Sequence, residues 1–103
     1  MKFYLVTNDC ASLYMIGIKV TVFSKSDSEI LKESLEKDCF DFKTKSSSDL
    51  CSNCPDLKVL PTPKESLSLP RSEFSILMKG RTKLKELKVL LNKVFPTRYY
   101  AQL

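Results

Sequence analysis

The chain has 103 residues, of which 43% are hydrophobic, and its formal net charge is +5. This length fits one domain with a single hydrophobic core, and no apolar run approaches the roughly 18 residues of a membrane-spanning helix. Histidine is absent and glycine occurs only twice, so the chain lacks both the commonest general base and a glycine-rich phosphate loop. We therefore expect no catalysis, no small-molecule substrate and no membrane association.

The sequence pattern assigns no helix or strand to residues 1–15, and we treat them as an N-terminal extension. Four apolar residues precede Thr7, which is too short a run for the apolar region of a secretory signal. The same stretch is not rich in arginine, so we expect no organellar presequence either.

The first predicted element is a strand over residues 16–23. Its alternate positions are all β-branched, which is a strong strand signal; they are Ile16, Ile18, Val20 and Val22. A helix follows, because Ser26 and Glu29 fit a capping box and apolar residues recur at helical spacing as far as Lys37.

The pattern between residues 39 and 72 is weaker. Residues 39–42 indicate the start of a second strand, and the polar, serine-rich stretch 44–56 predicts a loop. Three prolines then disfavour a helix, so we expect an extended, exposed arm over residues 58–72. These prolines are Pro61, Pro63 and Pro70.

The last part of the chain predicts a strand and a helix. Apolar residues alternate again over residues 73–79, and Gly80 ends that strand. Thr82 is a suitable N-cap for a second helix, whose apolar stripe runs from Leu84 to Phe95.

Together these elements predict one domain of mixed α/β (α+β) class over residues 16–95. It contains a loop and arm at 45–72, and the tail 96–103 forms either a last edge strand or a docking segment. Two helices on one face of a small mixed sheet would bury the apolar faces of the strands and of the helices against each other. The predicted core consists of Val20, Val22, Leu35, Ile76, Leu87 and Leu91.

Basic residues are concentrated near the C-terminal end. Residues 79–103 contain seven Lys and Arg against Glu86 alone, a net charge of +6. Such a local excess is the expected footprint of a phosphate-binding surface, and the alternative is a solvated lysine-rich helix. Lys and Arg alternate around the end of this strand, and the helix that follows directs further basic side chains to several sides. This arrangement suits the irregular phosphate positions of folded RNA. The candidate RNA contacts are Lys58, Lys64, Arg71, Lys79, Arg81, Lys83, Lys85 and Lys88.

Cys51 and Cys54 have the spacing of a metal-binding or redox motif. With Cys10 and Cys39 they would supply the four thiolates of a structural zinc site. As a pair at the start of a helix they would instead form a redox centre. The remaining interpretation is that these cysteines have no special role. Apart from zinc in the first case, we expect no cofactor.

Several stretches of the sequence resemble the family of the tenth protein of the small ribosomal subunit. Residues 18–23, Ile-Lys-Val-Thr-Val-Phe, resemble the family's opening strand, and the helix after them is similarly placed. Residues 60–62, Leu-Pro-Thr, resemble the start of its long arm. Residues 69–76 and 80–84 resemble a later strand and the basic run after it. The resemblance covers about residues 16–90, and the order of its parts agrees with the predicted elements.

This resemblance implies a ferredoxin-like fold with a projecting, Pro-rich arm. It also implies a place in the head of the small subunit, among ribosomal RNA and neighbouring ribosomal proteins. The function would be architectural, with Lys and Arg neutralising phosphates where RNA helices converge. Lysine outnumbers arginine fourteen to three, which indicates an AT-rich genome. We therefore expect a mitochondrial ribosome and, failing that, the cytoplasm.

Two other classes of function remain open. A protein-interaction module with a zinc-stapled loop would use the four-cysteine site. A thioredoxin-like redox protein would share the strand–helix–strand start and use Cys51 and Cys54.

Overall fold

A computed structural model describes residues 3–11, 14–52, 62–95 and 99–102. Eight elements follow one another along the chain: β1 (Phe3–Ala11), β2 (Ile16–Val22), α1 (Lys25–Lys37), β3 (Asp41–Ser46), α2 (Pro63–Ser66), β4 (Ser72–Met78), α3 (Arg81–Val94) and β5 (Tyr99–Gln102).

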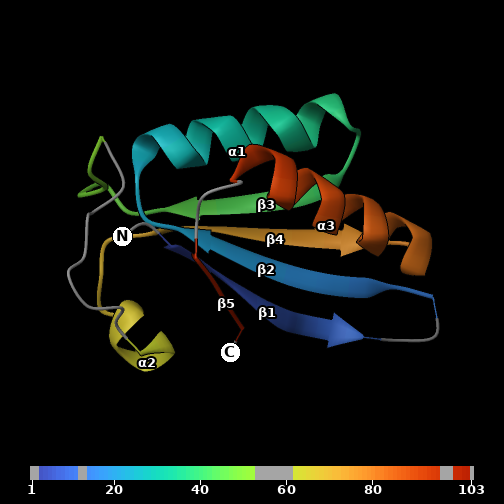
Figure 1. Cartoon of the computed structure of the whole chain (residues 1–103), viewed down its shortest axis with the longest axis horizontal. Coiled ribbons are helices and arrows are strands. Elements are labelled where there is room, and N and C mark those ends of the chain that lie inside the picture. Colours follow the sequence, from blue (N-terminus) through green and yellow to red (C-terminus); the bar gives the residue numbers. More distant parts are fainter. Residues whose placement is uncertain (1–2, 12–13, 53–61, 96–98, 103) are drawn as a thin grey trace.

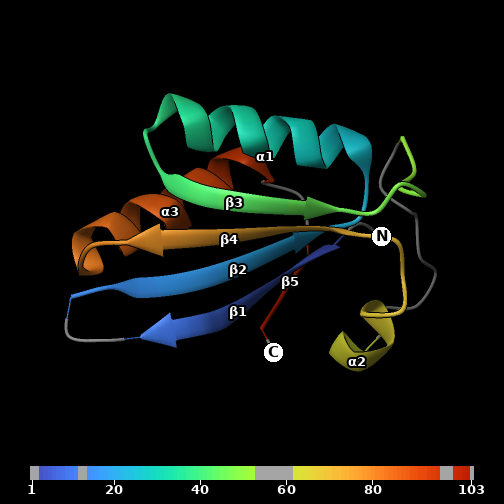
Figure 2. The ribbon, with the colours of Figure 1, turned by 180° about the vertical axis from the view of Figure 1, so that it is seen from behind.

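The five strands form one sheet in the order β3-β4-β2-β1-β5. Neighbouring strands are antiparallel except β1 and β5, which are parallel. Figure 1 and, from behind, Figure 2 both show α1 and α3 on the same face of this sheet. The structure thus confirms the predicted α+β class, with two helices on one face of a small mixed sheet.

From β2 onward, the strands and the two long helices follow the strand–helix–strand–strand–helix–strand order of a ferredoxin-like domain. Of the tail, residues 99–102 form a last edge strand, β5, one of its two predicted forms. The sheet has one strand more than that order supplies, because β1 lies between β2 and β5.

β1 lies within residues 1–15, where the sequence pattern predicted an N-terminal extension without a strand. Tyr4 and Val6 point into the core beneath the helices, and Leu5 is buried as well. Because successive side chains of a strand point to opposite faces, β1 is buried on both faces near its start. Its first four residues, Phe3 to Val6, are therefore a continuous apolar run without the alternation that marks the other strands.

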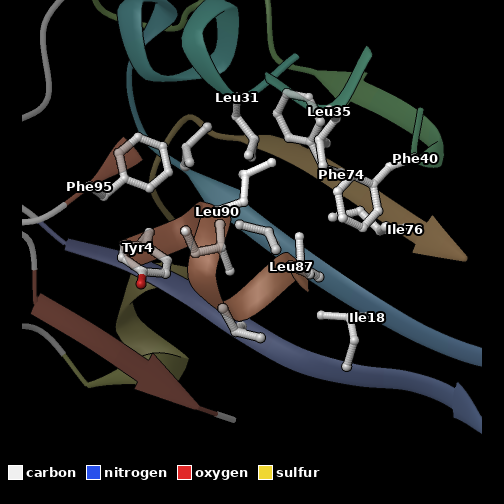
Figure 3. Close-up of a cluster of buried hydrophobic side chains, with 14 of the residues drawn as sticks. Tyr4, Ile18, Leu31, Leu35, Phe40, Phe74, Ile76, Leu87, Leu90 and Phe95 are labelled. Atoms are coloured by element: carbon white, nitrogen blue, oxygen red, sulfur yellow. The ribbon is translucent and has the colours of Figure 1, made fainter. Parts of the chain in front are cut away.

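The hydrophobic core lies between the sheet and the two long helices (Figure 3). All six predicted core residues belong to it and are buried: Val20, Val22, Leu35, Ile76, Leu87 and Leu91. Aromatic rings fill the space around them. Phe74 is fully buried beside Phe42, and Tyr4 lies against Phe95 with 5.3 Å between ring centroids.

α1 begins two residues earlier than predicted. The N-cap is Ser24, whose hydroxyl accepts a hydrogen bond from the Asp27 amide at 3.2 Å. The predicted capping box of Ser26 and Glu29 is therefore wrong. The carbonyl of Cys51 also accepts from the Lys25 amide at 2.6 Å. The loop after β3 thus helps to satisfy the first amides of α1, a contact between distant segments that the local sequence does not reveal.

The C-terminal end of α1 is a Schellman motif. The Phe40 amide donates to the Leu35 carbonyl at 2.9 Å, and the Cys39 amide donates to the Glu36 carbonyl at 3.2 Å. This geometry places Cys39 in the left-handed region, with φ of 58°. A residue that carries a Cβ atom is strained there, whereas glycine is not.

Replacing Cys39 with glycine is expected to raise the free energy of unfolding by about 0.5–1 kcal/mol. Relief of the Cβ clash exceeds the extra chain entropy that glycine has in the unfolded state. In a domain of this size, Tm would rise by about 2–8 °C in a thermal denaturation experiment. Cys39→Ala is the matched control, because it removes the exposed thiol but keeps the Cβ atom. A Tm equal to that of the wild type for Cys39→Gly would show that this position is not strained.

The expected extended arm is wrong for residues 63–66, which form the helical turn α2. Pro63 occupies the first helical position, where the missing N–H would be unpaired in any case and the fixed φ suits a helix. Thr62 and Glu65 form a capping box, with side chain to backbone distances of 3.2 and 3.1 Å. Ser66 is fully buried. Residues 58–61 lie outside the described part of the chain.

Candidate nucleic-acid interface

α3 presents cations on the side that faces away from the core. Its buried side chains are Leu87, Leu90 and Leu91. Five basic residues at its start and along its outer side are exposed, and we call them the α3 cations: Lys79, Arg81, Lys85, Lys88 and Lys93. Within the described residues, none of them takes part in an ion pair.

The N-terminal end of α3 carries positive charge that no acidic residue of its first turn offsets. The N-cap is Gly80, with φ of 86°, and not the predicted Thr82. No side chain caps the first amides, and the first turn contains no acidic residue. The helix dipole gives this end a partial positive charge, and Lys79 and Arg81 add to it. A phosphate group near this end would therefore be stabilised by both.

Lys83 belongs to the predicted RNA contacts, but the structure gives it a role within the fold. Its ammonium donates to the Asp38 carbonyl at 3.1 Å and forms an ion pair with Glu86 at 3.2 Å. It also lies 4.4 Å from the centre of the Phe40 ring, a cation–π contact. Lys83 thus connects α3 to the C-terminal end of α1 and does not belong to the α3 cations.

Arg71 is engaged within the fold as well. Its Nε atom donates to Glu73 at 2.8 Å, and its Nη1 atom donates to the Leu67 and Leu69 carbonyls. The hydrogen bond from Arg71 holds the pKa of the Glu73 carboxyl below its usual value, although partial burial opposes this effect. The Lys19 ammonium, whose Nζ atom lies 3.7 Å from Glu73 Oε2, lowers this pKa further. Arg71 therefore ties the segment after α2 to β4.

The two remaining predicted contacts lie elsewhere or are not described. Lys64 is exposed on α2, at the end of the molecule away from most of α3 (Figure 1). Lys58 lies outside the described residues. Of the eight predicted RNA contacts, four are therefore exposed on α3 or directly before it: Lys79, Arg81, Lys85 and Lys88.

A groove between α1 and α3 widens this basic surface. Its volume is about 880 Å³, and Lys37 lines it together with two of the α3 cations, Lys85 and Lys93. Ser34 and Thr82 also line it, as do two acidic residues, Asp38 and Glu86, so the groove carries one positive charge more than negative ones. Lys37 and Lys93 were not among the predicted contacts, because their alignment depends on how the two helices pack.

The cysteines do not assemble into the four-thiolate site. Cys39 follows the C-terminal end of α1, whereas the Cys51 backbone pairs with Ser24 at its N-terminal end. A helix of 13 residues separates these ends by about 20 Å, so both thiols cannot bind one zinc ion. Both are free and exposed. Cys54 and the side chain of Cys10 are not described, and the described residues contain no group of three metal ligands.

Neither a membrane-spanning helix among the described residues nor a similar known protein was found. In the described ranges, no helix is long and apolar enough to cross a membrane. A scan against protein-family models, a search of curated proteins and a search of solved structures found no match.

Proposed function

We propose that this protein is a structural RNA-binding protein of the small ribosomal subunit, in a mitochondrial ribosome. The observation that carries the proposal is the surface of α3, where five exposed cations lie without an ion-pair partner among the described residues. Unpaired cations repel one another in the free protein, and a polyanion removes that repulsion while its counterions are released.

The arrangement of the cations favours folded RNA over the groove of a DNA duplex. Lys85 and Lys93 line the groove toward α1, whereas Lys88 lines the opposite side of α3. Charges on both flanks of one helix reach phosphates in several directions, as converging RNA strands present them. A helix that reads the DNA major groove would instead direct its side chains to base edges along one stripe.

The resemblance to the tenth small-subunit protein supports the ribosomal part of the proposal. The order of elements from β2 to β5 agrees with the ferredoxin-like fold that it implies. The long arm lends no support, because the described residues 62–66 form a capped helical turn. Meanwhile, the rival zinc-stapled module loses its four-cysteine site, since Cys39 and Cys51 lie at opposite ends of α1.

The test is sedimentation of the native protein on a sucrose gradient of cell or organelle extract. We expect the protein to sediment with the small ribosomal subunit and to move to the top of the gradient after ribonuclease treatment. A ribosomal protein of known position provides the control in the same fractions. Sedimentation as a free protein, in extract whose subunits are intact, would contradict the proposal.

A further inference from the structure

A second groove lies on the other flank of α3, between that helix and β1. Its volume is about 400 Å³. The floor consists of apolar side chains: Tyr4, Val6, Ile18, Leu84, Leu87 and Leu91. Figure 3 shows Tyr4, Ile18 and Leu87 along this side of the core. Because Tyr4 is held against Phe95 and Leu87 is 1% exposed, the floor is already formed in the free chain.

The rim of this groove is polar and almost uncharged. Asn8 on β1 and Asn92 near the C-terminal end of α3 both line it and are exposed. Lys88, one helical turn before Asn92, is the only charged residue that lines the groove in the described part of the chain. Each amide side chain offers both donors and an acceptor, so the rim can form hydrogen bonds with a planar group whose edge carries both.

We propose that this groove accepts one unpaired nucleobase of the RNA, an inference that rests on the proposed function. The apolar floor, which includes the Tyr4 ring, would cover one face of the base, and a rim amide, Asn8 or Asn92, would form hydrogen bonds with its edge. Lys88 would bind an adjacent phosphate, because it belongs both to this rim and to the α3 cations. Proteins that recognise RNA sequence commonly take up unstacked bases in this way.

The chemistry of the groove favours a base over a peptide. An acidic peptide would find a single cation there, and an apolar peptide side chain would use the floor but not the rim amides, which are exposed and would remain hydrated. A nucleobase uses the apolar floor and a rim amide together.

The experiment uses single-stranded RNA oligonucleotides of one length and sequence, with one abasic nucleotide moved along the strand. The abasic position keeps its phosphate, so only the base contribution changes. At one position we expect binding, measured by fluorescence anisotropy, to weaken about 5-fold or more, with an unchanged salt dependence. Equal affinity at every position would overturn the base site and leave the RNA-binding proposal intact. If no oligonucleotide or folded ribosomal RNA fragment binds, both proposals fail.

Two variants locate the site. Leu84→Phe fills the groove, and Ile30→Phe, a similar change at an exposed position of α1, is its control. We expect Leu84→Phe to remove the difference between intact and abasic RNA, and Ile30→Phe to retain it. Asn92→Ala is exposed and should fold normally; it should weaken binding of the intact strand but not of the abasic one. A full difference in both Leu84→Phe and Asn92→Ala would place the base elsewhere and overturn the proposal.

Discussion

Replacing Leu87 with alanine is expected to lower the free energy of unfolding by about 2–5 kcal/mol. Leu87 is 1% exposed and lies in the centre of the core that α3 forms with the sheet. Truncation removes buried methyl groups and leaves a cavity, and the surrounding strands can close it only in part. A loss of this size is a large fraction of the stability of a small domain.

Urea denaturation, followed by circular dichroism, measures this loss as a lower midpoint at constant slope. Val89→Ala is the control on the same helix, because Val89 is 67% exposed and alanine is the better helix former. It should be neutral or slightly stabilising. A loss below about half a kcal/mol for Leu87→Ala, far under the cavity cost, would mean that α3 does not pack on the sheet as described.

Replacing Lys79, Arg81, Lys85 and Lys88 together with glutamine is expected to flatten the salt dependence of RNA binding. Each lost phosphate contact lowers the slope of log affinity against log salt by about 0.7–0.9, so four contacts remove roughly 3. Titration of a folded ribosomal RNA fragment at several potassium chloride concentrations measures the slope. The affinity at low salt should fall most, because there counterion release contributes most.

The matched control removes the same number of charges from other surfaces, at Lys25, Lys32, Lys43 and Lys45. These lysines are exposed on α1 and β3, and their loss lowers the net charge equally. The slope should then change much less than in the α3 variant. Equal changes in both variants would indicate binding governed by total charge, and an unchanged slope in the α3 variant would exclude this surface.

The structure also separates charged residues that bind from those that hold the fold. Lys83 and Arg71 resemble their neighbours in sequence, yet both are engaged with the chain itself. A local signal existed in each case: Lys83 and Glu86 are three apart on a helix, and Glu73 follows Arg71 by two residues along an extended chain. Such spacings place opposite charges side by side, and they would have marked both residues as paired.

The sequence by itself determined the elements whose two faces differ. β2, β4 and the two long helices were predicted within a few residues, and so was the core that they share, because an element with one buried face repeats its apolar residues at its own period. The concentration of cations near α3 was equally visible, since it depends on composition alone.

Tertiary structure decided what depends on contacts between distant segments. β1 was hidden because both of its faces are buried near its start, and the N-terminus of α1 depends on carbonyls of the loop after β3. The groove between α3 and β1 and the separation of Cys39 from Cys51 exist only once α1 and α3 pack on the sheet. Periodicity reports how one element meets the core, but it carries no information about which element lies beside it, so these features could not be read from the chain.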